Sequence, residues 1–416
     1  MKIVLLSANY PYGQGGDNNF IVNEIQALTE TFDQVVVIST GEGELRKDIP
    51  KTVKVVKCPI ISKHIFYMFK ALFLSIDRQA YRAHKELKHF YPNLGFFTRF
   101  KQIVKYNYSY ECLKKTLVKE CINADIVYSY WLSSRAYAYA RVKKNKGYNN
   151  VFISRSHGFD CYLSRNAYLP YRRFTSEQLN EIIFISKNGK ESFERETYPM
   201  LDKNCRLSVH YLGVNKNVEN QIYKSSNIIN IVTCSSIIEV KRLDIIINAL
   251  SFINDIKICW VHFGDGNMAK KIKDFAFEKL GDKHNIEYQF KGNVDNEDLI
   301  EYYRNNNVDL FVNTSDSEGI PVSIMEAYSF GIPAITRDVG GNREINCGNN
   351  KGYLLDKNAT AKDFAKAITE YAYQSEEERV IRRNEVKKIF KEKFSAKAIK
   401  DYCESIRGIR SKEHAK

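Results

Sequence analysis

Apolar runs of strand length alternate with longer segments of helical periodicity along the whole chain. In the first half, the runs that predict strands lie at residues 3–7, 35–39, 53–57, 125–130, 151–154 and 182–186. In the second half they lie at residues 228–234, 256–263, 286–290, 308–313 and 332–336. The segments 20–31, 61–122 and 361–408 have helical patterns instead. Regular alternation of strand and helix predicts an α/β protein with parallel sheets.

One polar stretch divides this pattern into two similar halves. Residues 215–227 lack apolar periodicity, which predicts a linker. We therefore expect one Rossmann-like domain at 1–214, a second at 228–390, and a helical C-terminal segment at 391–416. For this last segment, crossing back to the first domain is an alternative to staying with the second. The 416 residues are enough for two domains with large cores.

The stretch 308–345 carries the clearest candidate chemistry. An apolar strand ends there at a polar turn, and Glu318 and Gly319 follow just before a helical pattern begins. Unpaired backbone N–H groups and the dipole at a helix start favour a phosphate. A second acid, Glu326, lies inside the helix. Two carboxylates beside an anion site suit hydrogen bonds from hydroxyl groups, as on a ribose and a sugar.

Glu318 and Glu326 are separated by seven residues in the sequence SEGIPVSIMEAYSFGIPAI. This stretch resembles the E-x7-E signature of the family-4 retaining glycosyltransferases of the GT-B fold. The resemblance implies two facing Rossmann-like domains with the active site in the cleft between them. It also implies that Glu318 lies beside the donor sugar and that Glu326 binds ribose hydroxyls. The simpler alternative is that one acid only caps the helix.

The resemblance extends to other residues that would bind the nucleotide sugar. In the family, the backbone after the first acid faces the donor, which here means Gly319, Ile320, Pro321 and Val322.

Lys241 follows a predicted strand and resembles the family lysine that faces the donor diphosphate. A cation there would stabilise the negative charge that gathers on the leaving phosphate. The family usually has an arginine five residues earlier, where this chain has Ser236. Either Arg242 substitutes for it, or phosphate neutralisation depends more heavily on Lys241 and the helix N–H groups. A solvated lysine is the simpler alternative.

His157 lies in the sequence RSHGFD directly after a strand. This resembles the R-x-H-G-x-D motif of the family's N-terminal domain, whose histidine reaches the donor sugar from across the cleft. A structural histidine is the alternative. Arg155 and Asp160 complete the motif, and an ion pair between these two residues would explain them without any contact to substrate.

Two glycine-containing loops follow strands. The loop at 11–16 includes Gly15 and Gly16, where the backbone can approach a ligand closely. The turn Gly264–Gly266 is expected to border the nucleotide site. Neither has the full spacing of a dinucleotide fingerprint. Asp309 and Asp316 do not form a convincing metal pair, and the resemblance implies a family that needs no bound metal or other cofactor.

Charge and composition add a membrane hypothesis. The net charge of +14 belongs to the first half, and residues 51–150 alone carry 20 Lys and Arg against 5 Asp and Glu. These bases are interleaved with aromatic residues, which favours an anionic membrane surface as partner. A helix core with a solvated basic face is the alternative. The N-terminus reads as a strand rather than a signal peptide, no run is long enough to span a bilayer, and the nine scattered cysteines fit a reducing cytosol.

We therefore predict a metal-independent retaining glycosyltransferase of the hexosyltransferase type. It would move a sugar from a nucleotide diphosphate, UDP first among the candidates, to a hydroxyl of a lipid-linked saccharide. The resemblance implies a role in capsule, O-antigen or exopolysaccharide assembly at the cytoplasmic face of the membrane. Two alternatives stay open: a nucleotide-sugar epimerase of the same fold, and a non-catalytic nucleotide-sugar or anion-binding protein. No helix-turn-helix, zinc or RNP-type motif supports a nucleic-acid partner.

Overall fold

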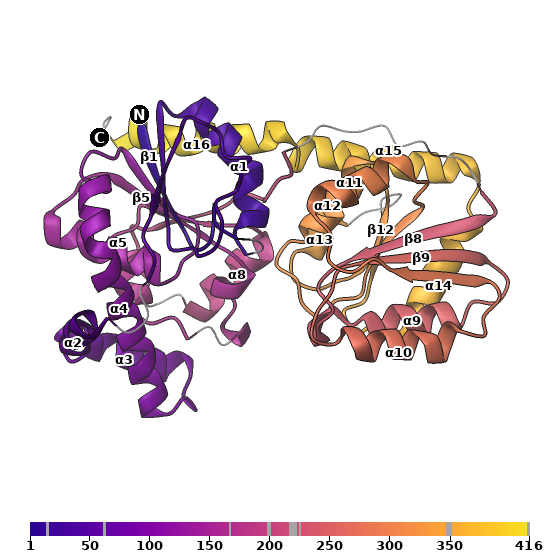
Figure 1. Ribbon diagram of the computed structural model, residues 1–416, viewed down its shortest axis with the longest axis horizontal. Coiled ribbons are helices and arrows are strands. Elements are labelled where there is room, and N and C mark those ends of the chain that lie inside the picture. The colour runs from indigo at the N-terminus through magenta and orange to yellow at the C-terminus, as the bar shows by residue number, and fades with distance from the viewer. Residues whose placement is uncertain are drawn as a thin grey trace. The chain divides into compact units, whose positions relative to one another are not determined.

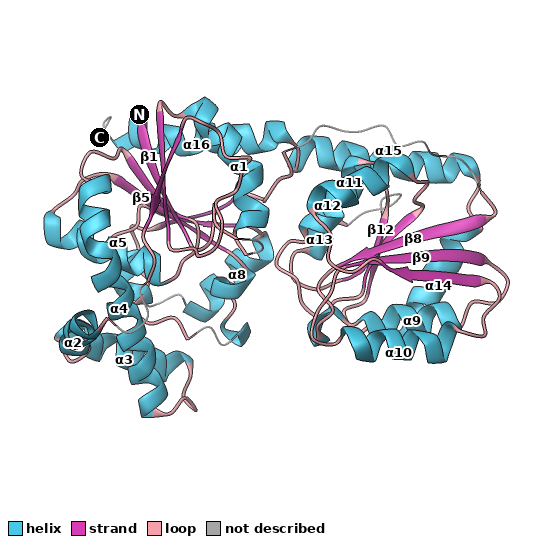
Figure 2. Cartoon of the chain, viewed as in Figure 1, coloured by secondary structure: helices cyan, strands magenta, loops and turns pink. Residues whose placement is uncertain are grey.

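The computed structural model describes residues 1–13, 16–60, 64–165, 168–197, 201–215, 223, 226–346 and 352–413. They form two compact units. The first consists of Met1–Tyr211 together with Ile399–Lys416, and the second of Leu212–Ala398. Both are α/β units with a parallel sheet (Figures 1 and 2).

The sheet of the first unit has seven parallel strands in the order β3-β2-β1-β4-β5-β6-β7. The strands are β1 (Lys2–Ser7), β2 (Gln34–Ser39), β3 (Val53–Lys57), β4 (Ile126–Ser129), β5 (Val151–Ser156), β6 (Glu181–Phe184) and β7 (Arg206–Val209). β1, β4 and β5 are almost entirely buried, as expected for central strands of a parallel sheet that helices cover on both faces. The chain moves outward from β1 in one direction to β3, then returns to the other side at β4.

Helices cover both faces of this sheet. They are α1 (Asn18–Thr31), α2 (Ile65–Leu74), α3 (Arg78–Phe90), α4 (Phe96–Cys121), α5 (Ser134–Lys146), α6 (Gly158–Cys161), α7 (Arg172–Ser176), α8 (Lys187–Thr197) and α16 (Ala396–Glu413), with the 3-10 turn η1 (Leu163–Arg165). Ile3 and Leu5 of β1 belong to a core with α1 and α16, while Val4 and Leu6 belong to a core with α3, α4 and α5. Alternate residues of one strand therefore serve opposite layers.

The second unit repeats the same plan with six parallel strands in the order β10-β9-β8-β11-β12-β13. The strands are β8 (Ile228–Cys234), β9 (Lys257–Phe263), β10 (Ile286–Phe290), β11 (Leu310–Asn313), β12 (Ala334–Arg337) and β13 (Tyr353–Leu355). The helices are α9 (Leu243–Ser251), α10 (Ala269–Leu280), α11 (Asn296–Asn305), α12 (Val322–Ser329), α13 (Asn342–Ile345), α14 (Ala361–Ala372) and α15 (Glu376–Lys393), with the 3-10 turn η2 (Glu239–Lys241).

The predicted secondary structure agrees closely with these elements. Every predicted strand is present, and the predicted helical segments 61–122 and 361–408 contain α2 to α4 and α14 to α16, with 61–63 outside the described residues. β7 and β13 were not predicted, because short strands without fully buried residues give no periodic signal. Across the described residues, no helix is long and apolar enough to cross a membrane. The eight cysteines in the described part of the chain are free thiols.

Candidate active site

Lys241 and Glu318 follow two neighbouring strands of the second sheet. Lys241 ends η2 after β8, and Glu318 lies in the loop after β11, the next strand in the sheet. Between β8 and β11 the strand order reverses, because β9 and β10 lie on one side of β8 and β11 to β13 on the other. In open parallel sheets, ligands bind outside the carboxyl ends of the strands at this switch point. The fold thus places both residues where a ligand is expected.

The two side chains form an ion pair. Lys241 Nζ lies 2.8 Å from Glu318 Oε1, and the same oxygen accepts a 3.0 Å hydrogen bond from Asn313 Nδ2 at the end of β11. The Glu318 side chain is 9% exposed, whereas the Lys241 side chain is 22% exposed. Among the described residues, Lys241 and Asn313 both donate to Oε1 of Glu318. Oε2 can therefore accept a hydrogen bond from a ligand hydroxyl.

Backbone contacts fix the loop that carries Glu318. The backbone N–H of Gly341 donates to the carbonyl of Gly319 over 2.8 Å. Gly340 has a φ of +53°, and a Cβ added to it would lie only 1.8 Å from the carbonyl oxygen of Glu318. Only glycine therefore fits at this close approach. On the other side, the hydroxyl of Thr314 donates to the carbonyl of Lys241 over 3.0 Å, which joins the two loops.

Glu326 lies near the same strand ends, on helix α12. Pro321 is the N-cap of α12, so the residues from Gly319 to Val322 form the turn into the helix. Glu326 is 6% exposed, and its Oε1 accepts a 2.6 Å hydrogen bond from Asn296 Nδ2 at the start of α11. The pKa of Cys234, the last residue of β8, is raised to about 12 by burial and further by the Glu326 charge. A buried carboxylate therefore stands close to the carboxyl end of β8.

Arg242 makes different contacts from Lys241. It is in the left-handed conformation (φ +49°) and its guanidinium binds two carboxylates, Asp244 at 3.0 Å and Asp316 at 3.1 Å. The hydrogen bonds that Arg242 donates to these carboxylates raise its pKa above the usual value, with Asp244 the larger cause. Asp316 also pairs with Arg337. Ser236 is exposed. The charge of Arg242 is thus offset within its own cluster.

The turn at Gly264 and Gly266 supports the loop after β8. A Cβ on Gly264 would lie 1.9 Å from the carbonyl oxygen of Ser235, and one on Gly266 would lie 2.4 Å from that of Ile237. These two glycines let the backbone after β9 lie directly against the backbone after β8. This close packing explains why glycine is needed at both positions, without any contact to a ligand.

His157, in the first unit, is held by local contacts at the end of β5. It is 3% exposed and is the N-cap of α6, where its side chain and that of Asp160 form a capping box. Its Nε2 lies 3.1 Å from the carbonyl oxygen of Tyr130, so this nitrogen carries the proton. The ring centroid lies 4.2 Å from that of Trp131. Burial, together with the Arg155 charge, holds the pKa of His157 well below its usual value, and the ring is neutral near pH 7.

Arg155 and Asp160 do not pair with each other, so that alternative is wrong. Arg155 is fully buried and forms an ion pair with Glu24 of α1, and its guanidinium also lies 4.4 Å from the ring centroid of Tyr402 on α16. Asp160 instead accepts hydrogen bonds from the hydroxyl of Ser156, at 2.9 Å, and from backbone N–H groups. Burial raises the pKa of Asp160 to about 6. Both motif residues thus stabilise the first unit.

The loop after β1 is organised by Asp17. Its buried carboxylate accepts hydrogen bonds from the Ser7 hydroxyl (2.8 Å) and from the backbone N–H groups of residues 8 to 10. Gly16 has a φ of +59°, and a Cβ there would lie 2.4 Å from Asn9 Nδ2. Gly15 lies outside the described residues.

Arg135 lies where the strand order of the first sheet reverses. It follows β4, the neighbour of β1, and donates to the hydroxyls of Thr40 (3.0 Å) and Ser133 (3.3 Å). Burial lowers the pKa of this arginine, which the Asp17 charge partly opposes. No motif in the sequence singled out this cation, because its neighbours come from three separate loops.

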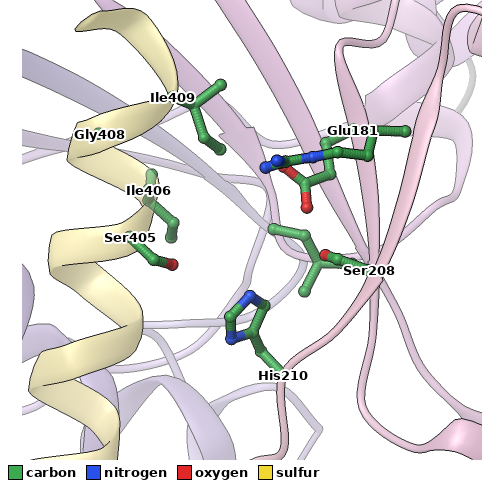
Figure 3. A pocket seen from close by; sticks show the side chains of 9 residues that line it. Glu181, Ser208, His210, Ser405, Ile406, Gly408 and Ile409 are labelled. Atoms are coloured by element: carbon green, nitrogen blue, oxygen red, sulfur yellow. The ribbon is translucent and has the colours of Figure 1, made fainter. Parts of the chain in front are cut away.

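A cavity of about 320 Å³ lies elsewhere in the first unit, between α16 and the strands β6 and β7 (Figure 3). Its lining includes Glu181, Ser208, His210 and Ile406. None of the residues singled out in the sequence lines it. Across the described residues, no group of three or more His, Cys, Asp or Glu side chains is arranged to hold a metal ion. Metal independence stays a prediction.

Comparisons with known proteins agree with this geometry. Residues 215–388, which include Lys241, Glu318 and Glu326, match the family "Glycosyl transferases group 1". A stretch of 77 residues is 40% identical to the O-antigen biosynthesis glycosyltransferase WbnH of Escherichia coli, and it covers 16% of this chain and 21% of that protein. The chain thus spans about a fifth of the length of the curated relatives it matches.

Similarity of structure extends over the whole chain. The Anabaena protein HepE, solved in complex with UDP and glucose, has a TM-score of 0.66 at 17% identity, with 98% of this chain and 99% of that chain covered. The lipopolysaccharide outer core galactosyltransferase WaaB has a TM-score of 0.65 at 17% identity, with the same coverage. Together with the two doubly wound sheets, these neighbours confirm the predicted GT-B fold class.

Proposed function

We propose, from the group 1 glycosyl transferase match over residues 215–388, that this protein is a retaining glycosyltransferase. It would transfer a sugar from a nucleotide diphosphate, most simply UDP, to a hydroxyl of a lipid-linked saccharide in surface polysaccharide assembly. The observation that carries the proposal is the Lys241–Glu318 ion pair at the switch point of the second sheet, with Glu326 close to the same strand ends. The UDP bound to HepE and the O-antigen role of WbnH support the choice of donor and product.

In this proposal the second unit binds the donor. Backbone N–H groups of Gly319, Ile320 and Val322, at the start of α12, would meet the diphosphate, since a helix N-terminus favours an anion. Glu326 would accept hydrogen bonds from the ribose, and Asn296 would hold its carboxylate in place. Oε2 of Glu318 would accept a hydrogen bond from a hydroxyl of the sugar. Each carboxylate thereby has a hydroxyl partner and does not need to face the phosphate.

The chemistry is a substitution at the anomeric carbon with departure of the diphosphate from the front face. The bond from the anomeric carbon to the phosphate oxygen breaks, the bond to the acceptor oxygen forms, and the acceptor's proton passes to the leaving phosphate. Lys241 would stabilise the charge on that phosphate, and its ion pair with Glu318 holds the ammonium in position. No side chain needs to act as a covalent nucleophile.

The same geometry limits what His157 contributes. Its Nε2–H already donates a hydrogen bond to the Tyr130 carbonyl, and its low pKa keeps the ring neutral. A general acid needs a proton it can release near the working pH. We therefore assign His157 a positioning or sugar-contacting role and no proton transfer.

On the acceptor side, Arg135 is the cation that would meet an anionic group at the switch point of the first sheet.

One assay separates this function from its alternatives. The protein is incubated with a panel of nucleotide sugars, with and without lipid-linked saccharide acceptors, and products are followed by mass. We expect a product one sugar heavier than the acceptor, formed from a UDP-sugar and retained in chelator-treated buffer. A changed nucleotide sugar without acceptor would identify an epimerase. Binding without any product would identify a non-catalytic protein.

A further inference from the structure

Helix α2 presents an apolar surface that none of the described residues of the first unit covers. Within α2, only Ala71 is buried. Phe66 is 54% exposed, Phe69 57% and Phe73 72%. We call the exposed side chains of this region the α2 surface, and it consists of Ile65, Phe66, Met68, Phe69, Leu72, Phe73 and Ile76. Contiguous exposed apolar side chains on this scale mark an interaction site, whereas single exposed ones do not.

The remaining edge of α2 is fixed firmly to the first unit. α2 packs on α4, and Asn107 Nδ2 of α4 donates to Ser75 Oγ over 3.0 Å. Ser75 Oγ in turn donates to the carbonyl of Ala71 at 2.6 Å. At the other end, the backbone N–H of His64 donates to the hydroxyl of Tyr108 over 2.9 Å. In Figure 1, α2 and α3 stand at one end of α4, away from the sheet. The α2 surface is therefore held outward by specific contacts.

Lys and Arg outnumber Asp and Glu in α2 and in the segments that follow it. Residues 64–76 contain no acid and one base, Lys70, whose Nζ lies 4.0 Å from the ring centroid of Phe66. Asp77, the next acid along the chain, is already paired with Arg141. Exposed bases follow on α3 and α4, namely Arg78, Arg82, Lys85, Lys88, Lys101 and Lys105. The partner must accept both aromatic rings and positive charge.

We propose that the α2 surface docks this protein on an anionic lipid bilayer, with the rings in the interface and the bases at the headgroups. A bilayer supplies an apolar layer directly beneath negative charge, which matches this arrangement. A second copy of the chain would bring the same bases together, and like charges across an interface oppose association. With ten residues, α2 is too short to span a bilayer and would lie in its plane.

Membrane docking deepens the proposed function and rests on it, since docking would bring the enzyme to a lipid-linked acceptor in the membrane. The test is sedimentation of the full chain with vesicles of phosphatidylglycerol and phosphatidylcholine mixed equally, and with pure phosphatidylcholine vesicles. We expect binding to the anionic vesicles at low salt, little binding to the neutral ones, and release at high salt. The assay contains no nucleotide or acceptor, so its result is independent of whether the protein transfers a sugar.

The decisive variant is Phe66→Ser/Phe69→Ser/Phe73→Ser. Each lost ring should weaken vesicle binding by on the order of tenfold, because one buried aromatic side chain supplies about that factor. The matched control is Phe252→Ser/Phe277→Ser/Tyr373→Ser, which removes three rings of the second unit that are 50%, 74% and 72% exposed. Thermal unfolding checks that both triple variants fold as the parent does.

Three results would overturn the proposal. The first is vesicle binding of the α2 variant equal to that of the control. The second is no binding of the parent to anionic vesicles at low salt. The third is a dimer of the parent, found by analytical ultracentrifugation without lipid, that the α2 variant abolishes, which would assign the α2 surface to a second copy. Loss of binding in the α2 variant alone, with a monomeric parent, supports it.

Discussion

The ion pair between Lys241 and Glu318 allows a sharp test of the proposed chemistry. Lys241→Ala removes the cation that would face the leaving phosphate, and it also leaves the Glu318 side chain, which is only 9% exposed, without its 2.8 Å partner. The lost charged hydrogen bond is worth about 1.5–3 kcal/mol of stability. Because the lysine side chain is itself 22% exposed, we expect the lower part of that range. Turnover should fall by roughly two to three powers of ten, as when one preorganised donor is removed.

The double variant Lys241→Ala/Glu318→Gln separates the two effects. It removes the unpaired carboxylate together with the lysine, and Asn313 keeps an oxygen to which it can donate. Denaturant unfolding should therefore show that the double variant regains part of the stability that Lys241→Ala loses. Turnover, measured at saturating donor, should stay low, since the cation is still missing. Glu318→Gln alone measures what the sugar-facing carboxylate contributes.

Arg242→Ala is the matched control, because Arg242 is the next residue and its charge is offset by Asp244 and Asp316. We expect it to change turnover much less than Lys241→Ala does. Near-normal turnover in Lys241→Ala, or its recovery in the double variant, would refute the assignment of the lysine to the leaving phosphate. A large loss in Arg242→Ala alone would show that Arg242 replaces the arginine missing at Ser236.

Three further predictions concern the nucleotide site and its supports. Glu326→Gln should weaken binding of UDP by on the order of tenfold to a hundredfold, because it loses a charged hydrogen bond. Calorimetry measures the UDP affinity, and unchanged affinity in a folded variant would show that Glu326 does not bind the ribose. Gly340→Ala should lower both stability and UDP affinity, since its Cβ would lie 1.8 Å from the carbonyl oxygen of Glu318. The control Gly147→Ala, with φ +66° and open space around it, should cost only about 1–2 kcal/mol of stability. Equal losses of stability in the two variants would contradict this. Because the pKa of His157 is well below 6.5 in the folded chain, the unfolded chain takes up a proton there that the folded chain does not. The free energy of unfolding should therefore decline as pH falls below about 6.5, and this decline should be smaller in His157→Gln. Unfolding curves at several pH values test both expectations.

The sequence predicted the strand ends well and the side-chain partners poorly. The strands are short apolar runs bounded by polar turns, so their positions follow from local pattern, and the residues that follow β8 and β11 could be singled out directly. That these two strands are neighbours does not follow from the pattern and is shown by the sheet order. Local signals in the sequence therefore place Lys241 and Glu318 after strands, while the pairing between them is a property of the sheet order.

Partners distant in sequence could not be predicted at all. Asn296, which holds Glu326, comes from α11 and carries no motif. Glu24 lies 131 residues before Arg155, and no pattern links a residue of α1 to one of β5. The aromatic residues of 61–122 were ambiguous for the same reason. Their composition fits both a helix core and an interface, and the packing separates them: Tyr106 of α4 is buried, whereas Phe73 of α2 is exposed.

Helix α16 has a consequence for how the chain folds during synthesis. Ile399, Tyr402, Cys403 and Ile406 complete a core whose other members lie in the first 183 residues. The ribosome must add the whole of Leu212–Ala398 before these residues appear, which takes roughly 10 to 40 seconds at typical elongation rates. During that interval the nascent first unit carries an uncovered apolar face, while the second unit can already be complete. Domains usually fold in the order they are made; here the first unit to begin is the last to finish.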